Sequence, residues 1–474
     1  MVDVAAGPGA PPEGARKPGL SLGAKCWALL EGGRNPYVNL VTIYIFAPYF
    51  AASVVGDPVK GQALIAQVAV AYGLFAAVTA PFIGAAVDRF GPRKPWLALV
   101  TALNVPLICC LWFAKPHGAG LSVAVVATIL AACGVLVAWS QLLQNAMLTY
   151  AATPAERPAA SGLGLALGNL ISVVMLIAVL WAFALPGKIA LPFVPSKPLF
   201  GLDPLMNEPD RVVAPITAVF YGLLALPLFF FTRDAPRRND GAGASTATRD
   251  LLAALKGLRQ RRDLGRYLIA QMLFTDGLTA ILFFTGVYAG GVMKWQVLQL
   301  LSFALVLSVP AVFGGFLSGW MDRWIGTKRT LLIQLAVCVV TQILILGVGP
   351  EKIFYVVPWT ASEHAPLWGG PVFRTVPELV YLGIGMISAI AVTGAYASSR
   401  MMLVRLAPAK RIGVYFGLFS LSSTVTTWLG SLLVGLATAV FGTQQAGMVP
   451  IMLLLGTGGA ILWFVTVPSA PPED

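Results

Sequence analysis

Two acidic residues, Glu31 and Asp276, stand inside long apolar segments of this 474-residue sequence, and each is followed directly by a glycine. A charge in the core of a bilayer costs several kcal/mol, so a carboxyl group in such a segment is by default a functional candidate. Both histidines, His117 and His364, fall in polar stretches outside these segments. If the protein carries protons, a carboxylate must therefore bind them.

The two acids differ in their neighbours. Glu31 precedes Arg34 by three residues, which places both on one helical face, and a local ion pair is the simplest interpretation. Alternatively, Arg34 would hold an anionic group of a substrate through its planar fork, and the pair would accommodate a zwitterion. Asp276 has no basic residue within four positions. Its partner must come from another helix or be a proton.

Uncharged polar residues in the same apolar segments are further candidates for the wall of a substrate cavity. We predict that the cavity residues, besides Glu31, Arg34 and Asp276, are Asn35, Gln141, Gln144, Asn145, Asn169 and Tyr396. Such residues also hold membrane helices together by hydrogen bonds, and that alternative stays open here.

The composition requires a membrane protein. Hydrophobic residues make up 57% of the chain, charged residues 11%, and the mean hydropathy is +0.80, whereas soluble domains average about 25% charged residues. A soluble enzyme or a nucleic-acid binder is excluded. The sequence has no phosphate-binding loop, no metal-ligand spacing and no nucleophile–histidine–acid arrangement, so we expect no enzyme, cofactor or metal. The five cysteines are expected to be reduced, buried thiols.

A helix needs about 20 mostly apolar residues to cross a bilayer. The sequence predicts an all-α membrane protein with 12 transmembrane helices, at 26–55, 61–87, 95–114, 119–148, 159–186, 212–232, 267–293, 296–319, 330–349, 376–400, 411–441 and 447–468. Five parts are expected: a tail at 1–25, a six-helix bundle at 26–232, a linker at 233–266, a second six-helix bundle at 267–468 and a tail at 469–474. Residues 249–262 of the linker are expected to form a short amphipathic helix on the membrane surface.

The basic residues predict the orientation. With the N-terminus inside, 24 of the 32 Lys and Arg residues lie on or near the inner side. Positive charge favours the cytoplasmic face, so both termini are expected to be cytoplasmic and the location to be the inner membrane. The first 20 residues have no apolar core typical of a cleavable signal.

A short motif repeats after the second and eighth segments, about half the chain apart. Its glycine would form a tight turn, and its acid would cap a neighbouring helix and pair with a basic residue. We predict gating loops that stabilise one conformation and open in the other; the alternative is a topology signal only. The residues are Gly84, Asp88, Arg89, Gly91, Arg93 and Lys94 in the first copy, and Asp322, Arg323, Gly326, Lys328 and Arg329 in the second.

This repeat resembles the loop signature of the major facilitator superfamily, although the second copy has Ser318 at a glycine position and one extra residue before Gly326. A closer resemblance is to the family of vacuolar amino-acid effluxers and their bacterial relatives. It rests on Trp27 to Glu31, Asn35 to Tyr37, Phe46 to Phe50, Gln144 to Leu148, Ser161 to Gly164, Asp276 to Gly277, Ser399 to Arg400, Tyr415 to Leu418 and Trp428 to Gly430.

The resemblance implies a secondary transporter, monomeric as is usual in the superfamily, that moves an amino acid or a related small molecule by alternating access. The acids in its first and seventh helices would flank the central cavity and couple transport to protons. Sugars, peptides or lipophilic compounds are alternative cargoes, and a non-transporting assembly factor or sensor is an alternative function. The expected partners are a small-molecule substrate and the lipid bilayer, with no nucleic acid.

Overall fold

The computed structural model describes residues 20–90, 92–153, 156–187, 194–236, 261–360, 364–407 and 412–468. Within these ranges, the side chains of 80–82, 84–90, 158–159, 412–414, 416–417, 420–421 and 423–427 are not described. The predicted surface helix at 249–262 therefore lies outside the described residues except for its last two positions.

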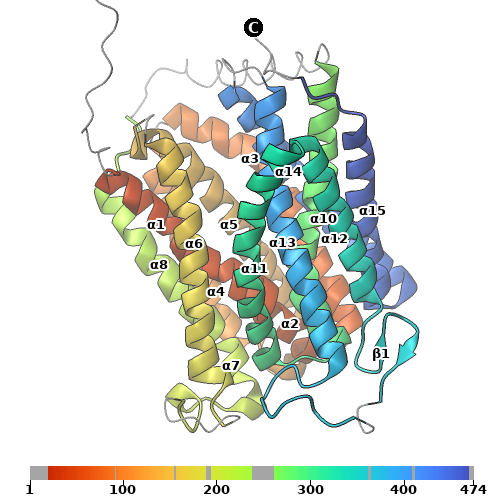
Figure 1. Ribbon diagram of the computed structural model, residues 1–474. Coiled ribbons are helices and arrows are strands. Elements are labelled where there is room, and N and C mark those ends of the chain that lie inside the picture. The colour runs from red at the N-terminus through yellow and green to blue at the C-terminus, as the bar shows by residue number, and fades with distance from the viewer. Residues whose placement is uncertain are drawn as a thin grey trace, which may run out of the picture.

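The first half contains six helical segments that run the length of the molecule (Figure 1). They are α1 (Leu22–Pro36) continued by η1 (Tyr37–Tyr44), α2 (Phe46–Tyr49) and η2 (Phe50–Val54); α3 (Pro58–Phe90); α4 (Lys94–Cys110) with η3 (Leu111–Phe113); α5 (Val123–Ala151); α6 (Arg157–Val179) with η5 (Leu180–Ala184); and α7 (Glu208–Arg211) followed by α8 (Val213–Phe231).

The second half repeats this arrangement with α10 (Arg262–Val292), α11 (Val297–Trp324), α12 (Thr327–Leu346), α13 (Val376–Leu406), α14 (Ile412–Phe441) and α15 (Gln444–Trp463). A small antiparallel hairpin of β1 (Lys352–Ile353) and β2 (Val357–Pro358) follows α12. Eleven segments of the described chain are long and apolar enough to cross a membrane, and α14 ends in the shorter apolar stretch Trp428–Phe441. The protein is thus a multi-pass membrane protein with the predicted twelve helical segments.

The predicted spans match these helices to within a few residues, except at their polar ends. α10 begins at Arg262, inside the predicted linker, and α13 continues to Leu406, six residues past its predicted end. Helices extend beyond the apolar core where polar residues continue the backbone pattern into the interface, so hydropathy alone underestimates their length.

Helix pairing is the same in the two halves. α1 packs against α6 and α8, α3 against α5, and α4 against α5 and α8; correspondingly, α10 packs against α14 and α15, α11 against α13, and α12 against α13 and α15. Equivalent helices therefore occupy equivalent places in each bundle. Apolar side chains such as Phe230, Phe313 and Phe316 remain largely exposed on the outside, which suits a surface in contact with lipid.

The first helix is irregular near its middle. Pro36 has no backbone N–H to donate, and the next eight residues, Tyr37–Tyr44, adopt π-helical hydrogen bonding before Ile45 leaves helical geometry altogether. α1 through η2 is consequently a broken helix, and the break lies where this segment faces the second half.

Polar caps fix several helix ends. Thr375 and Glu378 form a capping box at the start of α13. Glu156 accepts hydrogen bonds from the backbone N–H groups of Thr153 and Ser21, at 3.0 and 2.7 Å, and so ties the α5–α6 turn to the start of α1. These bonds, the one from Thr153 above all, hold the pKa of the Glu156 carboxyl below its ordinary value.

Candidate functional site

A cavity of about 840 Å³ lies between the two halves. Helix α6 and the broken segment of α1 supply its wall on one side, and α10, α11, α12 and α13 supply the other. Such a volume is in the range of pockets that enclose small organic ligands. Most of the lining is apolar, and the lining residues with polar side chains are Asn39, Tyr44, Asn169, Ser172, Thr285, Tyr288, Ser308, Gln342, Tyr381, Ser388 and Thr393.

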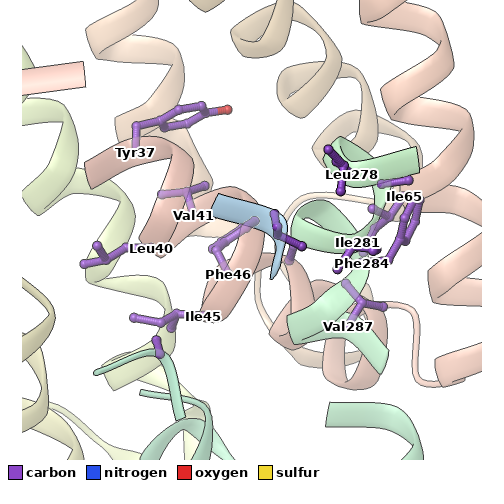
Figure 2. Close-up of a cluster of buried hydrophobic side chains, with 14 of the residues drawn as sticks. Tyr37, Leu40, Val41, Ile45, Phe46, Ile65, Leu278, Ile281, Phe284 and Val287 are labelled. Carbon is purple, nitrogen blue, oxygen red and sulfur yellow. The ribbon is translucent and has the colours of Figure 1, made fainter. Parts of the chain in front are cut away.

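The two halves are packed together at the end of the molecule opposite the start of α1. Side chains of η1 and α2, including Val41 and Phe46, belong to one buried cluster with Phe284 and Val287 of α10, as Figure 2 shows. The backbones approach so closely that a Cβ atom on Gly286 would lie 1.8 Å from the carbonyl oxygen of Ile43. Only glycine permits this contact.

Two buried glutamines join the halves at the same end. Gln62 of α3 donates from Nε2 to Thr438 Oγ1 at 2.9 Å and to the carbonyl oxygen of Gln444 at 3.1 Å. Gln444 of α15 donates in return to the carbonyl oxygen of Pro58 at 3.2 Å. We call Gln62, Thr438 and Gln444 the glutamine latch. Toward the other end, α6 and α11 diverge (Figure 1), while α3 and α14 stay packed.

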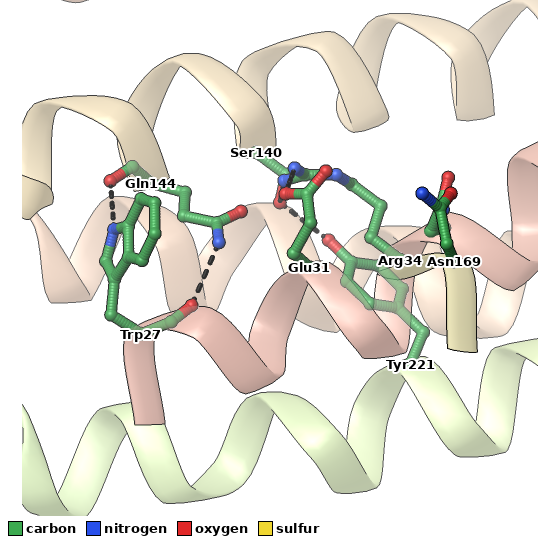
Figure 3. A network of polar contacts seen from close by, with 8 residues as sticks. Trp27, Glu31, Arg34, Ser140, Gln144, Asn169 and Tyr221 are labelled. Atoms are coloured by element: carbon green, nitrogen blue, oxygen red, sulfur yellow. Dashed lines mark hydrogen bonds and ion pairs between the residues drawn. The ribbon is translucent and has the colours of Figure 1, made fainter. Parts of the chain in front are cut away.

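Glu31 and Arg34 form an ion pair with each other. Arg34 is 3% exposed, and it also donates to Ser140 Oγ of α5 at 3.4 Å, while Tyr221 of α8 donates to the same oxygen at 2.8 Å (Figure 3). Glu31 is a quarter exposed. The pair is thus bound into the first bundle, and neither residue lines the cavity described above.

The predicted amide residues separate into distinct environments. Gln144 and Trp27 exchange hydrogen bonds with each other's backbone carbonyl oxygens, at 3.0 and 2.6 Å, which fixes α5 to α1 (Figure 3). Asn169 lines the cavity, and Asn35 donates to its side-chain oxygen at 3.5 Å. Gln141 and Asn145 are exposed and do not line this cavity.

Asp276 is 2% exposed and faces α14. Its Oδ2 accepts a hydrogen bond from the backbone N–H of Gly430 at 2.7 Å, and its buried Oδ1 has no hydrogen-bond partner among the described residues. A Cβ atom on Gly430 would lie 3.2 Å from that Oδ1, so the glycine lets the carboxyl lie against the helix. Thr279 lies about one turn after Asp276 on α10, and its hydroxyl shares a 2.9 Å hydrogen bond with the hydroxyl of Tyr396 on α13.

The first predicted gating loop is described only in part. Gly84, Asp88 and Arg89 belong to the last turns of α3, but the side chains of Asp88 and Arg89 are not described, and Gly91 lies outside the described residues. The N–H groups of Arg93 and Lys94 donate to the carboxylate of Asp234 at 2.9 to 3.0 Å, and Lys94 Nζ donates to the carbonyl oxygen of Phe229 at 2.8 Å. Asp234 therefore caps α4 from the end of α8.

The second gating loop is held within its own half. Ser398 of α13 donates to Asp322 Oδ1 at 3.0 Å, and Lys328 donates to the carbonyl oxygen of Trp463 at 2.7 Å. Gly326 has φ +89°, a conformation that favours glycine at this tight turn. Arg323 and Arg329 are exposed.

Several residues of the site gave little signal in the sequence. Gln62 lies in the predicted span 61–87, so a search for amides in every span would have found it, whereas Gln444 lies three residues before the predicted span 447–468 and would have been missed. Ser172 and Tyr288 gave none, since serine and tyrosine are common at any helix contact. In the described part of the chain, no three His, Cys, Asp or Glu residues gather as metal ligands.

Comparison with known proteins gives one family match and one curated relative. Residues 38–362 match the family model described as "Major Facilitator Superfamily". Autophagy-related protein 22 of the yeast Kluyveromyces lactis is 25% identical over 245 residues, which are 47% of this chain and 45% of that protein. The match thus spans under half of the relative's length.

Solved structures of transporters share the fold at low sequence identity. A mutant of the nucleoside transporter NupG is 12% identical with a TM-score of 0.65 and covers 93% of this chain and 98% of its own. The D-xylose–proton symporter is 12% identical with the same TM-score, covering 96% and 98%. A bacterial homologue of the lysosomal transporter Spinster, in an inward-facing and unoccupied conformation, is 15% identical with a TM-score of 0.60, covering 94% and 95%.

Proposed function

The chain belongs to the Major Facilitator Superfamily, and from that premise we propose that it is a secondary active transporter working by alternating access. The observation that carries the proposal is the cavity between two equivalent six-helix halves, which are packed together at one end, while α6 and α11 diverge at the other (Figure 1). Rocking of one half against the other would open the packed end and close the other around the same cavity. The cavity forms within one chain, so a monomer suffices.

The packed end has the chemistry of a gate. Its contacts are a dry apolar cluster, a glycine crossing and the glutamine latch, and none of these is covalent or ionic. Each neutral hydrogen bond is worth only about 1 kcal/mol net. A bound solute with unequal affinity for the two states could therefore shift the balance between them.

Asp276 is our candidate for proton coupling. A carboxylate that is buried without a cation carries a large desolvation penalty, and among the described residues no basic side chain forms an ion pair with it. The neutral, protonated acid suits the packed surroundings seen here. Exposure in another state would favour ionisation and release of the proton.

The first test uses purified protein in proteoliposomes, with uptake of a solute panel measured with and without an imposed pH gradient. Asp276→Asn keeps an acceptor for the Gly430 N–H but cannot ionise. We expect this variant to retain solute exchange. Its rate of uptake driven by the pH gradient should fall at least about tenfold. Asp263→Asn, at the half-exposed start of the same helix where the acid pairs with Arg266 at 3.5 Å, is the control and should behave as wild type.

Gradient-driven uptake by Asp276→Asn at the wild-type level would end the proton-coupling part of the proposal. An absence of flux for every solute would instead favour a non-transporting role. For orientation, we propose that both termini are cytoplasmic and that the membrane is the inner membrane, which the basic residues support.

The resemblance to amino-acid effluxers makes an amino acid one candidate cargo. Such a zwitterion would need charged anchors, and the available pair, Glu31 and Arg34, is already satisfied within the first bundle. The geometry of the cavity supports a different class of cargo, argued next.

A further inference from the structure

We propose that the cavity between the halves binds an uncharged organic solute that has both hydroxyl or amide groups and an apolar face. This inference rests on the proposed transport function and names the class of its cargo. It is carried by the charge, the hydrogen-bonding state and the placement of the lining residues.

The first observation is the absence of charge. None of the described residues that line the cavity is acidic, basic or histidine. A carboxylate or ammonium group moved from water into this space would lose its hydration without gaining an ionic partner. The lining therefore discriminates against amino acids, phosphates and other ions.

The second observation is a set of three polar atoms without partners. Ser172 Oγ, Tyr288 Oη and Gln342 Oε1 have no hydrogen-bond partner among the described residues, and all three residues line the cavity. Their side chains are 1 to 2% exposed. Buried polar groups are normally paired, so each unpaired one needs an explanation. A ligand in the cavity would supply it by donating to the glutamine oxygen and sharing hydrogen bonds with the two hydroxyls, once a rotation of these side chains brings the atoms to the cavity surface.

Two other hydroxyls in the wall differ from these. Thr285 and Ser308 donate to the carbonyl oxygens of Ile281 and Leu305 in their own helices. Their hydrogen-bonding needs are met without a ligand. The polar positions of the wall are thus not equivalent, and those of Ser172, Tyr288 and Gln342 are the ones that lack a partner among the described residues.

The rest of the wall is apolar and aromatic, with Tyr44, Leu176, Phe303, Tyr381 and Met448 among its members. A solute polar on every side would lose hydration against these side chains without compensation. An apolar ring or chain on the solute would instead bury its surface there.

The unpaired atoms come from both halves. Ser172 belongs to α6 of the first bundle, whereas Tyr288 and Gln342 belong to α10 and α12 of the second. One solute bound to all three would bridge the halves in this conformation. Its binding energy would then differ between conformations, as a transported solute requires.

The test is a binding measurement on the purified full-length protein by thermal shift and calorimetry, without transport. Each of two probe pairs joins an uncharged solute to an anionic analogue with the same rings: phenyl β-D-glucoside with phenyl β-D-glucuronide, in which a carboxylate replaces the hydroxymethyl group, and uridine with uridine 5′-monophosphate, which adds a phosphate. Leucine is the zwitterionic probe. We expect at least one uncharged probe to bind, its charged counterpart to bind at least tenfold more weakly, and leucine not to bind.

Two variants locate the site. Tyr288→Phe and Gln342→Leu each remove an unpaired polar atom, so the free protein should be as stable as wild type or more so, while affinity falls about fivefold each. Ser308→Ala is the control in the same wall, and its affinity should not change because its hydroxyl already bonds within α11.

The inference is overturned if the charged member of a pair or leucine binds more tightly, if no uncharged probe binds at millimolar concentration, or if both variants bind as wild type. Failure of the proposed function looks different. Binding of an uncharged probe without any flux would contradict the transport function and support the proposed binding site. Flux of an amino acid alone would support the transport function and contradict the proposed class of solute.

Discussion

Among individual residues, Glu31 and Arg34 show how one spacing in the sequence has two meanings. Three residues apart on α1, they are placed to bind each other or to bind a zwitterion between them. They form the ion pair, and Arg34 is buried and further bonded to Ser140. That arrangement favours a structural role in joining α1 to α5.

A double-mutant cycle separates the two roles. Glu31→Gln leaves the buried guanidinium without its anion, and we expect it to lower the free energy of unfolding by about 1–3 kcal/mol. Arg34→Gln in the same chain removes the unpaired charge, so the double variant should be more stable than Glu31→Gln alone. Melting temperatures in detergent measure both effects. Simple additivity of the two losses would contradict a coupled pair.

Among the helix crossings, the one at Gly286 holds the packed end together most closely. A side chain at this position of α10 would collide with the backbone of η1 at Ile43. We therefore expect Gly286→Ala to separate the packed end and to favour the conformation in which that end is open. Gly383→Ala on α13, where the added Cβ meets no atom within 4 Å, is the matched control.

The measurement is the labelling of a single reporter cysteine by a membrane-impermeant thiol reagent. Ile45→Cys, in a chain whose five native cysteines are replaced, is buried at the packed end in the wild-type background. Labelling should rise severalfold with Gly286→Ala and stay low with Gly383→Ala. Equal protection in both variants would show that the glycine crossing does not control the gate.

The elements also show what could be predicted from sequence. Span positions and the superfamily were predicted correctly, because a run of about 20 apolar residues and a repeated loop motif are properties of contiguous sequence. Of the predicted cavity residues, Asn169 lines the cavity described here, and the roles assigned to all of them stay predictions. Helices that are apolar on every side give no periodic signal for which face meets the partner half. The unpaired state of Ser172, Tyr288 and Gln342 depends on packing between distant segments. The roles assigned to the gating loops stay predictions.

For the whole molecule, alternating access requires the packed end to open in each transport cycle. Val59 of α3 and Gln445 of α15 line one small cavity at this end, beside the glutamine latch and across the boundary between the halves. A link between these positions would hold the end shut without replacing Gln62 or Gln444. The conformation seen here would then become the only one available.

We expect a reducible cross-linker joining Val59→Cys to Gln445→Cys, in the chain without native cysteines, to lower flux at least tenfold. Reduction should restore it. Each single-cysteine variant treated with the same reagent controls for the modification itself. Because the cavity would remain accessible from its divergent end, the locked protein should still bind its solute. Loss of both binding and flux would mean that the link distorts the fold, whereas full flux through completely linked protein would exclude rocking at this boundary as the transport mechanism.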